Sequence, residues 1–286
     1  MLSKLYLLFD KLLLFLISTS LFLAISGSFK VIFSGLLSKT FIIDTAILTF
    51  LVIFSTYGLN KLTDLKEDTV NNPERVGTIK KLGHIFKFSV ALSFILALIL
   101  GFLVNILILP VLLFPLFSGI LYSIRLSKNL PRLKDITGVK NIIIALTWAV
   151  SSTLLPIIYS SGRIDIYTLL IFYFFFFKSY INSILFDACD IEGDSMHGMR
   201  TIPILLGKSK TKKLLLILNS TFIPWLILSY YVGIFHRYVF ILAFSITYGY
   251  WYILHFYKEG IKRSRSLDLL VDGEWIPIII LVLIFV

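Results

Sequence analysis

The sequence predicts an all-α, polytopic transmembrane bundle. Hydrophobic residues make up 58% of its 286 residues, only 15% are charged, and the mean hydropathy is +0.93, outside the range of a soluble globular domain. The chain contains nine apolar runs, each of about 18 residues or more, the length a helix needs to cross a bilayer. These runs are continuously apolar rather than alternating, so we expect helices and not the strands of a lipid-facing barrel.

The candidate spans follow one another with short polar connections. In chain order they cover about 12–35, 41–59, 85–104, 106–123, 139–159, 166–186, 213–233, 236–257 and 267–286. The third and fourth meet at Asn105 with almost no loop, which predicts an antiparallel hairpin. The last span is the weakest, because its uninterrupted apolar part begins only at Trp275 and is too short to cross alone. No linker separates the spans, so we expect residues 1–286 to form a single domain.

The positive charges alternate from one connection to the next. Of the 27 Lys and Arg residues, 22 fall in the N-terminal segment and in the connections that follow the second, fourth, sixth and eighth spans. By the positive-inside rule this side is cytoplasmic, so we expect a multi-pass protein of the cell membrane with its N-terminus in the cytoplasm. This topology accounts for the basic residues, and we expect no nucleic-acid partner.

Acidic residues are concentrated in two stretches, each at the cytoplasmic end of a span. Residues 60–75 read NKLTDLKEDTVNNPER, residues 187–200 read DACDIEGDSMHGMR, and together they hold eight of the 16 Asp and Glu residues. Within each stretch two aspartates are four residues apart, a spacing that places both on one helix face. Clustered carboxylates at a membrane surface indicate a site for hard divalent cations.

Each acidic stretch forms a longer polar stripe. The stripes, spaced i, i+4, i+8 and i, i+3, i+7, consist of Asn60, Asp64 and Asp68, and of Asp187, Asp190 and Asp194. On facing helix ends they can hold Mg²⁺ with coordination positions left for phosphate oxygens, so the natural ligand is a diphosphate. The apolar bundle beneath implies a lipid tail, as in a polyprenyl diphosphate.

Several cations lie near these stretches in the sequence. Arg75 and Arg200 directly follow the acidic residues, and Lys128 and Lys140 belong to the connection between the fourth and fifth spans. These residues can bind a diphosphate. The topological interpretation, in which they only obey the positive-inside rule, stays open at this point.

The two stretches resemble the motifs of the UbiA superfamily of intramembrane prenyltransferases. The first family motif, N-D-x-x-D-x-x-x-D followed by N-x-P-x-R, is matched by Asn60, Asp64 and Asp68, then by Asn71 or Asn72, Pro73 and Arg75. The second, D-x-x-D-x-x-G-D followed by G-x-R-T-x-P-x-x-x-G, is matched by Asp187, Asp190, Gly193, Asp194, Gly198, Arg200, Thr201, Pro203 and Gly207. The chain departs from the pattern at Lys61, where many relatives have aspartate, and at Phe186, where many have lysine.

The resemblance implies Mg²⁺-dependent transfer of a prenyl group from a polyprenyl diphosphate, such as geranylgeranyl diphosphate, to an aromatic or lipid-precursor acceptor. It also implies about nine helices around a central cavity, with the active site facing the cytoplasm. The implied metal ligands are Asn60, Asp64, Asp68, Asp190 and Asp194. The implied diphosphate ligands are Asn60, Arg75, Lys128, Lys140 and Arg200. Catalytic roles are implied for Asp64, Asp187 and Asp190, with Asp187 either a further metal ligand or the base that deprotonates the acceptor.

Three alternatives remain open from the sequence. A cation-coupled membrane transporter would also use carboxylates at the ends of membrane helices. Lys178 lies too deep in the sixth span to reach the surface easily, and it either faces the cavity or forms a structural ion pair. The aromatic run Phe172–Phe177 either lines the cavity, where it would stabilise a carbocation, or faces lipid for most of its length.

Overall fold

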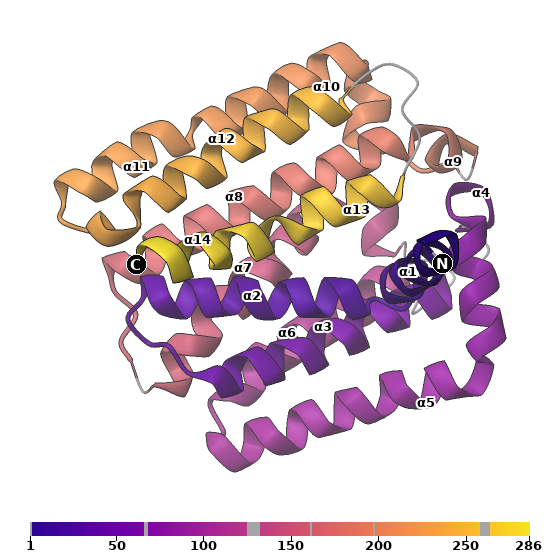
Figure 1. The fold of residues 1–286 in the computed structure, drawn as a ribbon, viewed down its shortest axis with the longest axis horizontal. Helices are drawn as coiled ribbons and strands as arrows, with labels where there is room; N and C mark the ends of the chain where they lie inside the picture. Colours follow the sequence, from indigo (N-terminus) through magenta and orange to yellow (C-terminus); the bar gives the residue numbers. More distant parts are fainter. Residues whose placement is uncertain (1, 66–67, 125–131, 161, 197, 258–263) are drawn as a thin grey trace.

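A computed structural model describes residues 2–65, 68–124, 132–160, 162–196, 198–257 and 264–286 (Figure 1). Within these residues the regular structure is entirely helical, which confirms the all-α class. The helices are α1 (Leu2–Ser18), α2 (Leu21–Leu37), α3 (Ile43–Thr63), α4 (Asp68–Asn71), α5 (Pro73–Val104), α6 (Ile108–Ser123), α7 (Val139–Tyr159), α8 (Ile166–Cys189), α9 (Ile191–Met196), α10 (Ile202–Ser220), α11 (Phe222–Tyr231), α12 (Val239–Phe256), α13 (Arg265–Val271) and α14 (Trp275–Phe285). Short 3-10 turns are η1 (Leu133–Asp135), η2 (His236–Tyr238) and η3 (Asp272–Glu274).

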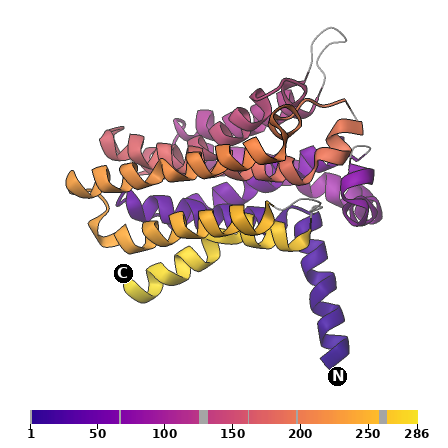
Figure 2. The same cartoon turned by 90° about the horizontal axis from the view of Figure 1, so that it is seen from above.

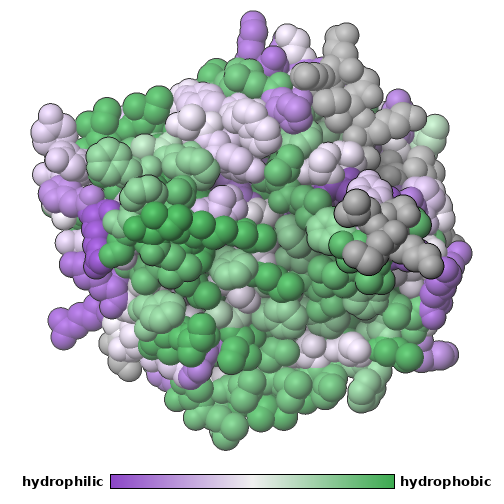
Figure 3. Space-filling view, in the orientation of Figure 1, coloured by the Kyte–Doolittle hydropathy of each residue, from purple (hydrophilic) through white to green (hydrophobic). Residues whose placement is uncertain are grey.

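The long helices run side by side as a bundle, and the short helices α4 and α9 lie together at one end of it (Figure 1). Apolar side chains cover the middle of the face seen in Figure 3, and hydrophilic side chains gather toward both ends of the bundle. This is the distribution that a bilayer requires, because lipid-facing side chains must be apolar and water-facing ends polar. The fold is therefore that of a multi-pass membrane protein.

Membrane-capable helices account for most of the expected spans. By length and composition, six helical segments in the described part of the chain can cross a bilayer, and seven can if the bent pair α1 and α2 is counted as one. The other two expected spans correspond to α6 and to α13 with α14, which are helical but shorter. The expected number of nine spans stays a prediction.

The first expected span, 12–35, is wrong as one continuous helix. The chain breaks between α1 and α2 with a bend of 71°, and Ser20 takes the left-handed conformation with φ 66°. The run Ser18-Thr19-Ser20 explains the break, because hydroxyl side chains compete with the helix for backbone partners. Figure 2 shows α1 standing away from the bundle. Across the bend, Lys61 of α3 donates its Nζ hydrogen to the Ile17 carbonyl, so the departure from the family pattern at Lys61 has a structural role.

Two helices begin well before the spans expected from hydropathy. α5 begins at Pro73, a residue favoured in the first helical turn, and α10 begins at Ile202. Each continues through a glycine with positive φ, Gly83 at 50° and Gly207 at 75°, where the helix is kinked. Glycine allows this conformation at low cost. The extra turns of α5 carry residues of the first motif beside the end of α3.

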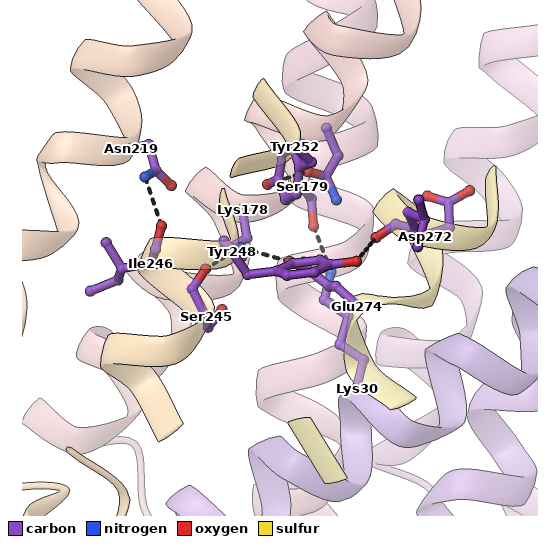
Figure 4. A network of polar contacts seen from close by, with 12 residues as sticks. Lys30, Lys178, Ser179, Asn219, Ser245, Ile246, Tyr248, Tyr252, Asp272 and Glu274 are labelled. Carbon is purple, nitrogen blue, oxygen red and sulfur yellow. Dashed lines mark hydrogen bonds and ion pairs between the residues drawn. The ribbon is translucent and has the colours of Figure 1, made fainter. Parts of the chain in front are cut away.

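A buried ion pair ties the last span to the middle of the bundle. The Nζ of Lys178 lies 2.7 Å from the Oε2 of Glu274, and both side chains are fully buried. Glu274 reaches the interior because the last span is interrupted by η3 between α13 and α14. The Tyr248 hydroxyl donates to the Leu270 carbonyl at 2.9 Å, on the helix preceding that turn (Figure 4). The structure thus shows Lys178 in an ion pair, and Lys178 does not line the cavity described below.

Removing only one member of this pair should destabilise the protein. Glu274→Gln leaves the Lys178 ammonium buried without the carboxylate that faces it. We therefore expect the free energy of unfolding to fall by about 3 kcal/mol or more. The double substitution Lys178→Met with Glu274→Gln removes both charges and should recover most of that loss. Thermal unfolding in detergent micelles measures both effects, with Glu192→Gln at an exposed carboxylate as the control. Equal melting temperatures for Glu274→Gln and the control would contradict the importance of the pair.

Candidate active site

A cavity of about 260 Å³ lies at the end of the bundle where α3 and α8 end. Its wall is formed by side chains from α1 to α9 and from α13, η3 and α14. It includes every residue of the two polar stripes: Asn60, Asp64, Asp68, Asp187, Asp190 and Asp194. Stretches 126 residues apart in the sequence therefore face the same space.

The first stripe does not continue along one helix. α3 ends at Thr63, Asp64 follows as its C-cap residue, and Asp68 begins the separate short helix α4. The backbone N–H of Asp68 still donates to the Asp64 carbonyl at 2.8 Å, which keeps these two residues one turn apart. Arg75 contacts the stripe from the first turns of α5, with its Nη1 at 3.2 Å from the Asp68 Oδ2. The cavity wall therefore holds a cation beside the carboxylates.

The second stripe is held by two side chains from the start of α7. Asp187 is only 3% exposed, and its Oδ1 lies 2.6 Å from the Lys140 Nζ. Its Oδ2 accepts a hydrogen bond of 2.8 Å from the Asn141 Nδ2. Asn141 also donates to the Ser183 hydroxyl at 2.8 Å, one turn earlier on α8. Asp187 is thus fixed in orientation, and Lys140 is engaged by a carboxylate.

Asp194 extends the acidic surface from α9. Its Oδ2 lies 3.7 Å from the Lys140 Nζ and makes no hydrogen bond to the described residues. Burial raises the pKa of the Asp194 carboxyl to about 6, with Lys140 lowering it and the neighbouring Asp187 and Asp190 raising it further. Carboxylates that repel one another in a buried site favour a bound cation.

The residues of the cavity suit magnesium by their chemistry. Mg²⁺ prefers carboxylate and amide oxygens, and it is usually held by one or two carboxylates together with water and substrate phosphates. In the described part of the chain, no group of three acidic, histidine or cysteine side chains is close enough to hold a metal ion by itself. The ligands would therefore come from both stripes together with oxygens of the bound diphosphate.

Of the five predicted diphosphate ligands, three are found in this wall. Arg200 is exposed and is not one of the cavity-lining side chains. Lys128 lies outside the described residues. Arg75, Lys140 and Asn60 do line the cavity. A role for any of the five in binding diphosphate stays a prediction.

The aromatic residues of the cavity differ from those expected. None of Phe172–Phe177 lines it; Phe174 and Phe175, for example, are fully buried in the core, where they pack against Trp275. The rings that do line it come from several helices and are Phe22, Tyr57, Tyr122, Trp148, Phe186 and Trp275. The run on α8 is continuous in sequence, but its faces point in different directions.

Sequence reasoning missed part of the wall. Lys30 lines the cavity from α2, and its only sequence signal is a charge within an otherwise apolar run. Asp268 and Asp272 line it from α13 and η3, although in the sequence they only weaken the last span. Charged residues inside membrane segments are costly and mark functional sites by default.

Known proteins resemble this chain in sequence and in fold. A curated relative, the digeranylgeranylglyceryl phosphate synthase of Sulfolobus acidocaldarius, is 28% identical over 222 residues, which is 76% of this chain and 76% of the relative. A solved structure of a UbiA homolog from Archaeoglobus fulgidus, bound to GPP and Mg²⁺, superposes with a TM-score of 0.70 at 16% identity, covering 94% of this chain and 95% of that one. A digeranylgeranylglyceryl phosphate synthase structure superposes with a TM-score of 0.61 at 23% identity, covering 96% of each chain.

The family assignment depends on the sequence rather than on these superpositions, which at such low identity show the fold. The sequence profile of the UbiA prenyltransferase family matches residues 12–267. That range includes both acidic stretches and every cavity-lining residue described above except Asp268, Asp272 and Trp275. The chain therefore belongs to the UbiA prenyltransferase family.

Proposed function

We propose that this chain transfers a prenyl group from a polyprenyl diphosphate, bound with Mg²⁺ among the aspartates, to a lipid-precursor acceptor inside the membrane. The observation that carries the proposal is one cavity lined by both acidic stripes, with Arg75 and Lys140 beside them and apolar helices around them. The curated relative is a digeranylgeranylglyceryl phosphate synthase, which favours an acceptor of the prenylated glyceryl phosphate class over an aromatic one. Membership of the family leaves no observation in favour of a transporter.

The arrangement supports departure of the diphosphate in two ways. The aspartates would hold Mg²⁺ at the end of the bundle, and the metal would supply positive charge for the diphosphate as leaving group. Arg75 and Lys140 offer donors to phosphate oxygens. The allylic carbon–oxygen bond breaks with its electron pair going to the diphosphate, and an acceptor hydroxyl oxygen forms the new bond to carbon.

The remaining step is loss of the hydroxyl proton to a cavity carboxylate. Asp187 is the carboxylate best fixed in orientation, since Lys140 and Asn141 hold its two oxygens. Aromatic rings in the wall, Tyr57 and Trp148 among them, stabilise the allylic cation without capturing it. The cavity also limits competition by water, because its inner part is surrounded by the bundle.

We further propose that the site faces the cytoplasm and that the protein lies in the cell membrane. The aspartates occupy the end of the bundle reached by α4 and α9 (Figure 1), and the basic connections of the sequence leave the helices at this same end. The positive-inside rule places that end in the cytoplasm. Water-soluble Mg²⁺ would then enter from the cytoplasm while both lipid substrates enter from the bilayer.

Removing an aspartate from either stripe should abolish use of the diphosphate. With geranylgeranyl diphosphate and Mg²⁺, we expect Asp64→Ala and Asp190→Ala each to lower diphosphate release by at least about 100-fold, since each loses a ligand of the charge-stabilising site. Asp44→Ala, at the opposite end of α3, is the matched control. Release that is independent of Mg²⁺, or unchanged in both variants, would overturn the proposed function.

Arg75 should contribute to diphosphate affinity. Arg75→Gln removes a charged donor from the cavity wall, so we expect the KM for the prenyl diphosphate to rise about tenfold with a smaller change in kcat. Lys81→Gln removes a positive charge from an exposed position on the same helix and should leave the KM near the wild-type value. Steady-state kinetics in detergent or nanodiscs measure both. Equal KM values for the two variants would show that Arg75 serves only to hold Asp68.

A further inference from the structure

The N-terminal helix α1 carries large apolar side chains that the bundle does not cover. Leu5, Leu8, Phe9 and Leu12 are each more than half exposed. Their spacing of i, i+3, i+4 and i+7 places them on one face of the helix, as in an amphipathic helix. These four side chains are called the apolar face of α1 below. An exposed apolar surface of this kind indicates an interaction site.

The rest of the α1 circumference is more polar. Asp10 is paired with Arg265 at the start of α13, and Lys11 is exposed. At 3.6 residues per turn, Lys11 lies roughly 110° around the helix from the centre of the apolar face. A lysine at the border of an apolar face can extend its ammonium group into water while its stem stays beside the helix.

The direction of α1 differs from that of the bundle. α2 runs along the bundle with the other long helices (Figure 1), and α1 meets it with a bend of 71°. Figure 2 shows that α1 points away from the side of the bundle. Membrane helices stand close to the bilayer normal, so a helix that crosses the bundle direction lies close to the membrane plane.

Two contacts fix the level of α1 in the bilayer. At its end, the Ile17 carbonyl accepts a hydrogen bond from Lys61, in the last turn of α3. Nearer its start, Asp10 pairs with Arg265, whose Nη2 also lies 3.3 Å from the Oε2 of Glu74 in the first turn of α5. The partners of α1 are therefore all at helix ends. The 21 residues of α3 give a length of about 30 Å, the thickness of the hydrocarbon core, so its end marks the boundary between acyl chains and headgroups.

This level decides what covers the apolar face of α1. α1 packs against α5, which itself presents exposed apolar side chains such as Ile85 and Phe88 to the lipid. The apolar face of α1 thus continues a surface that the bilayer already covers. Lipid reaches it without any further protein, whereas water would leave four large apolar side chains hydrated at a cost in free energy.

We propose that α1 is an interfacial helix, whose apolar face binds the bilayer at the boundary between headgroups and acyl chains. Such a helix buries its apolar face in the outer part of the acyl-chain region and keeps its polar face in water. Lys11 then lies at the level of the headgroups, and α2 alone forms the first span. The inference is independent of the proposed function, because binding of lipid by α1 requires neither metal nor substrate.

The test measures the depth of each side of α1 in the full-length chain. In a Cys189→Ser background, which removes the single cysteine, a bimane label is attached to one of four variants: Leu7→Cys, Leu8→Cys, Lys11→Cys and Leu12→Cys. All four positions are exposed, so the label leaves the packing intact. In phosphatidylcholine vesicles with brominated acyl chains, we expect quenching about threefold stronger or more at the two positions of the apolar face. Iodide in the water should quench in the reverse order.

A matched pair of substitutions tests whether the apolar face holds the helix in place. Leu7 and Leu8 are adjacent leucines of similar exposure, 56% and 65%, on different faces of α1. With the label on Leu12→Cys, we expect Leu8→Asn to lower quenching by the brominated lipid about twofold or more, because it places an amide in the apolar face. Leu7→Asn should leave this quenching unchanged. Equal quenching in the two variants would overturn the role of the apolar face.

Other occupants of the apolar face give different results. A second copy of the chain or a different protein would shield the labels of Leu8→Cys and Leu12→Cys from brominated lipid and from iodide alike, which would overturn the proposal. Equal quenching by brominated lipid at Leu7→Cys and Leu8→Cys would also contradict it, since an interfacial helix has a distinct lipid-facing side. Thermal unfolding of each labelled variant, compared with that of Cys189→Ser alone, verifies that the bundle is intact.

Discussion

A charge placed between membrane helices must be neutralised by the protein or its ligand, because the bilayer interior offers no water to do so. This constraint organises the structure. Glu274 meets Lys178 at the break in the last span, and Lys140 meets Asp187 where α7 faces α8. Arg75 meets Asp68 beside the end of α3. Two of these pairs, Lys178 with Glu274 and Lys140 with Asp187, join helices that are distant in the sequence.

The same constraint explains why the acidic surface suits a metal-bound diphosphate. Asp187 and Asp194 share Lys140, at 2.6 and 3.7 Å, so a single ammonium faces two carboxylates. In the proposed function a divalent ion corrects this deficit of positive charge, and the cations of the wall bind the phosphate groups. Binding of metal and binding of diphosphate would then be interdependent, since neither alone balances the charges of the cavity.

The membrane bundle and the acidic site could be predicted from the sequence, because carboxylates are conspicuous in so apolar a chain. Asn60, Asp64, Asp68, Asp187, Asp190 and Asp194 all line one cavity, as expected. The break at Ser20, the kinks at Gly83 and Gly207 and the inward turn of Glu274 could not be predicted. Hydropathy measures whether a segment suits the bilayer, whereas these features depend on local backbone conformation and on partners far away in the sequence, such as Lys61 for Ile17 and Lys178 for Glu274.

The bend between α1 and α2 places the end of the N-terminal helix in the wall of the cavity. Ile17, at the end of α1, lines the cavity, and its carbonyl is held by Lys61 from α3. Asp10, two turns earlier in α1, is paired with Arg265 at the start of α13. α1 is therefore attached to two helices that also contribute to the cavity wall, to α3 through Ile17 and to α13 through Asp10. The bend lets a helix that stands away from the bundle keep both attachments.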